Sequence, residues 1–129
     1  MKTHYIEIPK EKWGIVLIHD FDVDREYNEL SAIMKSFGMK GGRIDYALSV
    51  LNTPNSGLTI SNDGLKMSVM FIGHATSKAQ FLNSLAHENV HVATAIVDYY
   101  QEPCDGESMA YLSGYLMQRI IEEIADIEY

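Results

Sequence analysis

Two imidazoles and a carboxylate occur together inside an otherwise apolar run in the second half of the chain. His87, Glu88 and His91 belong to the segment SLAHENVHVATAIVDYY, whose other residues are mostly apolar. Histidines four residues apart project from one face of a helix about one turn from each other, so one Zn²⁺ ion can contact both. Glu88 lies too far round the helix to be an easy third ligand, but it can reach a metal-bound water. This H-E-x-x-H pattern predicts a zinc site with Glu88 as general base.

The competing interpretation is a solvated helix face or a set of core side chains with ordinary polar partners. The neighbours Leu85, Ala86, Val90 and Ala93 are apolar and indicate a largely buried helix. Buried polar groups need partners, and a metal is the simplest partner that all three can share. A catalytic zinc ion would need a third protein ligand and would lower the pKa of a bound water toward ~7.

The segment from Thr76 to Met117 resembles the zincin metallopeptidases. It is most similar to the small single-domain zincin-like proteins of bacteriophages and prophages. The similarity rests on H-E-N-V-H followed by DGESMAYLSGYLM, in which a glutamate opens the next helix and AYL-G continues it. In glutamate-type zincins that glutamate is the third zinc ligand. The resemblance therefore implies that Glu107 joins His87 and His91.

The resemblance implies a zinc-dependent hydrolase, a metallopeptidase acting on protein or peptide in the cytoplasm of a bacterial host. Larger glutamate zincins carry an Asp four residues after the ligand glutamate, whereas this chain has Tyr111. The Tyr111 hydroxyl is a candidate for a hydrogen bond near the metal or to a substrate oxyanion, and packing is the alternative role. The alternative function is a non-catalytic phage virion or host-interaction protein in which the metal is a structural staple. The intact Glu88 favours the hydrolase, and the small size of the chain favours the alternative.

The length of the histidine-bearing helix restricts the third ligand. If the helix ran to Gln101 and turned sharply, Glu107 would lie opposite Tyr99 and away from His91. A ligand role for Glu107 therefore requires the helix to end near Asp98, so that residues 99–105 can return as a loop. The rival carboxylates in this region are Asp98, Glu102 and Asp105.

The elements that must position these residues follow from apolar periodicity and turn signals. We expect strands at 13–19 and 43–51, a hairpin of 57–60 and 65–72 around SNDG, and helices from about 22–24 to 37, from Ser77 and from Glu107 to about Ile127. This order predicts one α+β domain over residues 1–129, with a small, mainly antiparallel sheet packed by an N-terminal helix and two C-terminal helices. The 65–72 strand is either a substrate-binding edge or an ordinary core strand.

Composition narrows the partners and the compartment. Ten Lys and Arg residues and eighteen Asp and Glu residues give a net charge of −8. This charge argues against binding to nucleic acid. There is no apolar run of about eighteen residues, so we expect no membrane span. The first fourteen residues do not read as a signal peptide. The single cysteine, Cys104, allows no internal disulfide and suits a reducing cytosol. Among the other histidines, His74 and His19 follow strand ends, and His4 is expected near a mobile terminus.

Overall fold

The computed structural model describes residues 1–126 of the 129-residue chain. Its elements, in chain order, are β1 (Lys2–Ile8), β2 (Trp13–His19), α1 (Tyr27–Ser36), α2 (Gly41–Leu51), β3 (Gly57–Asn62), β4 (Met67–Ile72), α3 (Lys78–Tyr100) and α4 (Gly106–Ile124). The four strands form one sheet in the order β1-β2-β4-β3. The outer pairs β1–β2 and β3–β4 are antiparallel, and the central pair β2–β4 is parallel. The predicted α+β class with a mainly antiparallel sheet is confirmed.

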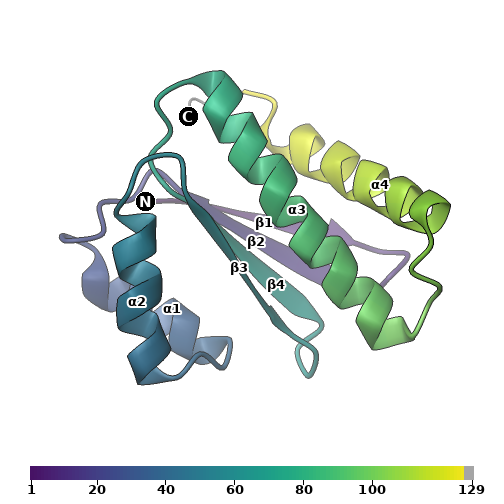
Figure 1. Ribbon diagram of the computed structural model, residues 1–129, viewed down its shortest axis with the longest axis horizontal. Helices are drawn as coiled ribbons and strands as arrows, with labels where there is room; N and C mark the ends of the chain where they lie inside the picture. The colour runs from purple at the N-terminus through teal and green to yellow at the C-terminus, as the bar shows by residue number, and fades with distance from the viewer. Residues whose placement is uncertain (127–129) are drawn as a thin grey trace.

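The sheet separates two helical layers, with α1 and α2 on one side and α3 and α4 on the other (Figure 1). Side chains alternate between the two faces along each strand. Leu17 of β2 and Met70 of β4 contact the cluster under α3 and α4, whereas Ile18 and Phe71 contact the cluster under α1 and α2. Both central strands are therefore covered on both faces, which explains why their sequences are almost continuously apolar.

The expected strand at 43–51 is wrong, because these residues form most of α2. Ile44, Ala47, Leu48 and Leu51 are buried at spacings of three and four, which is the period of one helix face. The parallel β2–β4 pair gives the physical reason. Parallel neighbours need a crossover connection across the sheet, and α1 and α2 form part of that connection.

The N-terminal segment is a strand rather than a mobile terminus. Residues 2–8 pair with the whole of β2, with Lys2 opposite His19 and Ile8 opposite Trp13. Ile6 and Ile8 are fully buried against α3 and α4. The expectation that His4 lies near a mobile end is therefore wrong.

The hairpin and both C-terminal helices are confirmed. The hydroxyl of Ser77 accepts a hydrogen bond from the Gln80 N–H at 3.1 Å and caps α3. The Asp105 carboxylate accepts from the Ser108 N–H at 2.8 Å and caps α4. α4 ends at Ile124, and the expected last residue of this helix, Ile127, lies outside the described residues. Within residues 1–126, every helix is too short or too polar to cross a lipid bilayer.

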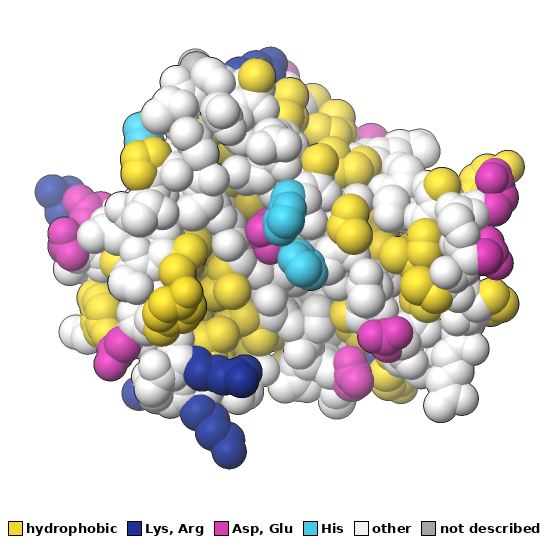
Figure 2. Space-filling model, viewed as in Figure 1, with side chains coloured by type: hydrophobic (Ala, Val, Ile, Leu, Met, Phe, Trp, Pro, Cys, Tyr) yellow, Lys and Arg dark blue, Asp and Glu magenta, His cyan; other side chains and the backbone are white. Residues whose placement is uncertain are grey.

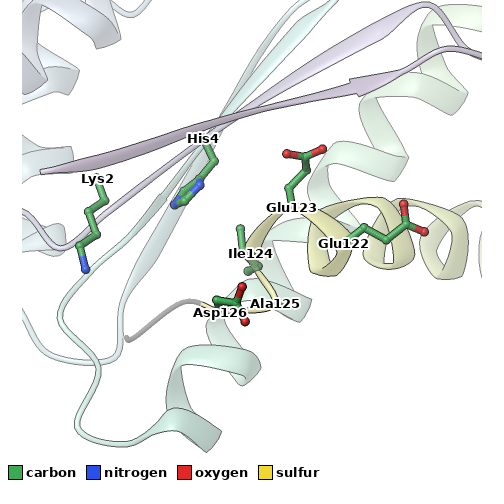
Figure 3. A pocket seen from close by; sticks show the side chains of 7 residues that line it. All are labelled: Lys2, His4, Glu122, Glu123, Ile124, Ala125 and Asp126. Atoms are coloured by element: carbon green, nitrogen blue, oxygen red, sulfur yellow. The ribbon is translucent and has the colours of Figure 1, made fainter.

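His19 is a buried titratable residue of the sheet. It ends β2 with 1% of its surface exposed, and its Nε2 lies 3.1 Å from Nε2 of His4. Figure 3 shows His4 beside a recess between β1 and the end of α4, which Glu123 and Asp126 also line. Burial, together with the charges of His4 and Lys2, lowers the pKa of His19 to about 4 from the ordinary 6.5.

We therefore expect His19 to destabilise the fold in acid. Between pH 6.5 and about 4 the unfolded chain binds a proton at this position and the folded chain does not. The free energy of unfolding should fall as the pH drops through this window, by roughly 3 kcal/mol in total. Urea unfolding at pH 7 and pH 4.5 of wild type and His19→Gln measures the effect. The wild type should lose more stability than the variant, and equal losses would contradict a neutral buried His19.

Candidate functional site

The two motif histidines lie side by side on the exposed surface of α3. The ring centroids of His87 and His91 are 5.2 Å apart, with an interplanar angle of 69°. The His87 side chain is 69% exposed. Figure 2 shows a pair of histidine side chains in contact near the middle of the face over α3, with an acidic side chain next to them. The predicted one-turn spacing of the imidazoles is therefore present, and the pair is accessible to an ion from solvent.

Glu88 points in a different direction, into the contact between α3 and the edge strand β3. It is 4% exposed. The Thr59 hydroxyl donates a hydrogen bond to Glu88 Oε1 at 2.8 Å, and Oε2 lies 3.9 Å from Nε2 of His87. A Cβ atom on Gly57 would lie 2.8 Å from Oε2, so only glycine leaves room for this carboxylate. One oxygen is thus held by the strand, and the other lies beside the histidine pair.

Gly57 and Thr59, the two β3 residues that contact Glu88, were not identified from the sequence. Gly57, Thr59 and Ser61 alternate with Leu58 and Ile60, and the two apolar residues pack toward α1 and α2. Glycine, threonine and serine on one face of a strand were the available signal, because such a face leaves space and a hydroxyl for a polar partner. Their partner was not identifiable without knowing which helix covers that face.

Of the two alternatives for the 65–72 strand, the structure has the core strand, and the edge of the sheet is β3. β4 lies between β2 and β3, so its backbone groups are paired on both sides. The Ser56 carbonyl accepts from the Gly73 N–H at 2.8 Å. Because main-chain groups alternate along a strand, the N–H and C=O groups of Thr59 and Ser61 then point away from β4. Among the described residues, a free strand edge therefore runs beside Glu88.

The structure does not place Glu107 beside the histidines. α3 continues to Tyr100 instead of ending near Asp98. The Asn89 side-chain amide donates to the Ser113 carbonyl at 3.0 Å and fixes the register of α3 against α4. Glu107 lies six residues before Ser113 on α4. This separation is roughly 9 Å along the helix axis, in the direction of the C-terminal end of α3. Within the described part of the chain, no three His, Cys, Asp or Glu side chains form a group that can hold a metal.

Tyr111 and two of the rival carboxylates, Glu102 and Asp105, also lie elsewhere. Tyr111 is 75% exposed and lines a recess together with Glu11 and Glu102, which does not include Glu88 or either motif histidine. Asp105 caps α4, as its position before that helix predicts. His74 is exposed in the connection between β4 and α3. The structure therefore brings together His87, Glu88 and His91, and adds Thr59 and Gly57 to them.

Comparisons of the chain with protein-family models, with curated proteins and with solved structures each found no significant match.

The exposed imidazole pair predicts zinc binding that depends on both histidines. We expect His87→Ala and His91→Ala each to weaken zinc binding at least ~10-fold, since each removes one of the two adjacent donors. Isothermal titration with ZnCl₂ and native mass spectrometry measure the affinity and the stoichiometry. His74→Ala is the matched control, because it removes an exposed histidine outside the site. Equal binding by wild type and both site variants would contradict the assignment.

Glu107→Ala in the same titration tests the predicted third ligand. Weaker binding in this variant would mean that α3 shortens when zinc binds, which would bring Glu107 to the histidines. Unchanged binding would remove Glu107 from the ligand set.

Proposed function

We propose that the protein is a zinc-dependent hydrolase, a metallopeptidase in which His87 and His91 hold the ion and Glu88 is the general base. The observation that carries the proposal is the Glu88 carboxylate, which is buried, held by Thr59 through Oε1 and directed toward His87 through Oε2. The resemblance of residues 76–117 to zincin-like proteins supports the same assignment. We also propose that the protein acts in the cytoplasm of a bacterial host.

The histidine pair fits a zinc ion. Zinc prefers imidazole nitrogens and carboxylates, and two imidazoles in contact on one helix face provide two of the donors it needs. Glu107 completes a glutamate-type ligand set only if the last turn of α3 unwinds, so the structure supports two ligands directly. A bound zinc ion would supply positive charge that acidifies a water and polarises a substrate carbonyl.

The chain's own residues provide the proton transfer. Glu88 Oε2 lies 3.9 Å from His87 Nε2, where it can accept a proton from a water next to the histidines and return it to the leaving amine. Thr59 fixes the carboxylate by its hydrogen bond to Oε1. Because Thr59 holds only one oxygen, the other remains available for the proton. The Glu88 side chain is therefore oriented before substrate binds, as general-base catalysis requires.

The free edge of β3 favours protein or peptide as the substrate. An extended peptide can pair with the outward N–H and C=O groups of β3 as an additional strand. Thr59 both offers these main-chain groups and holds Glu88, so a peptide paired at this position lies close to the proposed base.

A non-catalytic zincin-like protein is the second candidate, and two observations favour it. The histidines lie on an exposed helix surface rather than in a cleft, and the described residues provide no third ligand next to them. In this function zinc would be a structural ion, and the partner would be a phage or host protein.

Glu88→Gln separates the two functions. Glutamine keeps the size of the side chain and can still accept from Thr59, but it cannot take up a proton at neutral pH. For a hydrolase we expect unchanged folding and zinc binding, with turnover lowered ~10²–10⁴-fold. Cleavage of a quenched-fluorescence library of extended peptides measures turnover, and Gln80→Ala serves as a control on the same helix. Zinc-dependent cleavage that is equal in Glu88→Gln and wild type would contradict the assigned base.

A further inference from the structure

A recess lies along β3 beyond the candidate site, between the edge strand and the turn that joins α1 to α2. It has a volume of about 500 Å³. Phe37, Met39 and Ile60 give it an apolar lining, and Lys40 and Arg43 give it two cations. Figure 2 shows Lys and Arg side chains near the start of α2, beside hydrophobic side chains and on the same face as the histidine pair.

Among residues 1–126, the two cations of this recess have no acidic partner. Ion pairs between described residues involve Lys2, Arg119, His87 and the N-terminal amine, whereas Lys40 and Arg43 have no carboxylate within 4.0 Å among residues 1–126. The chain carries a net charge of −8, so acidic side chains are abundant. Two unpaired cations beside an apolar surface are complementary to a carboxylate on a short aliphatic stem.

The edge strand connects this recess to the candidate site. Gly57 and Thr59 contact Glu88, and the two residues that follow Thr59, Ile60 and Ser61, line the recess. Ser61 is two residues beyond Thr59 and four residues beyond Gly57, which is roughly 7 Å and roughly 13 Å along the strand. A peptide paired along β3 with its scissile bond near Glu88 therefore places a side chain within four residues of that bond over the recess.

We propose that this recess selects an acidic side chain, preferably glutamate, within four residues of the scissile bond of an extended peptide. The inference rests on the proposed hydrolase and adds its substrate class. In antiparallel pairing, which is the more stable arrangement, the peptide runs from the recess toward Glu88, so the acidic residue lies on the N-terminal side of the scissile bond. Lys40 and Arg43 are then specificity-determining residues that contact the substrate away from the reacting atoms.

Charge reversal in the recess tests the selection. The probes are extended peptides from a library in which one position at a time is Glu, Gln or Lys. For wild type we expect kcat/KM to fall roughly 5- to 10-fold when Glu at the selected position becomes Gln, and further when it becomes Lys. Arg43→Glu should reverse the preference between Glu and Lys. Lys78→Glu is the matched control, because it makes the same charge change at the start of α3, and it should keep the wild-type preference.

Binding of the same fluorescent peptides to Glu88→Gln separates this inference from the proposed function. The variant keeps the recess and lacks the base, so fluorescence anisotropy reports selection without turnover. Tighter binding of Glu peptides that Arg43→Glu abolishes and Lys78→Glu keeps supports the recess, even if wild type cleaves no peptide and the hydrolase assignment fails. Cleavage or binding with no preference between Glu, Gln and Lys, or no peptide binding at all, would overturn it.

Discussion

The contact between Glu88 and Thr59 is the constraint on which the site depends. A carboxylate inside a helix–sheet contact costs several kcal/mol unless hydrogen bonds replace its water. α3 can bury Glu88 because Thr59 donates to one oxygen and Gly57 has no side chain in the way of the other. The same contact places the histidine pair next to a free strand edge. Thr59 and Gly57 on β3 are therefore matched to the face of α3 that carries Glu88.

Most of the fold was predictable from local patterns, and the wrong strand at 43–51 has a long-range cause. The capping residues Ser77 and Asp105 and the hairpin turn mark their elements by short-range chemistry, which a sequence displays directly. The 43–51 segment is a short apolar run in which strand and helix periods are hard to separate. The parallel β2–β4 pairing decides in favour of a helix, because a crossover is needed there. That pairing is a long-range fact that the sequence does not display.

The candidate site was likewise predictable from the sequence only in part. His87, Glu88 and His91 lie on one helix, so their spacing determines their relative positions and was readable from the sequence. Positions of residues on other elements depend on where α3 ends and on its register with α4. Continuation of α3 to Tyr100 and the hydrogen bond from Asn89 to Ser113 carry Glu107 away from the histidines. Thr59 and Gly57 were missed because only the sheet order shows that β3 is the strand under Glu88.

A double-mutant cycle on the free energy of unfolding tests the Glu88–Thr59 contact most directly. Thr59→Val removes the hydroxyl at nearly constant shape, and Glu88→Met removes the carboxylate from an unbranched side chain. We predict a coupling energy of roughly 1–3 kcal/mol, because Thr59→Val leaves a buried carboxylate oxygen unpaired only when Glu88 is present. Urea unfolding of wild type, both single variants and the double variant provides the four values. Additive effects, with a coupling energy below about 0.5 kcal/mol, would contradict the account that β3 holds Glu88.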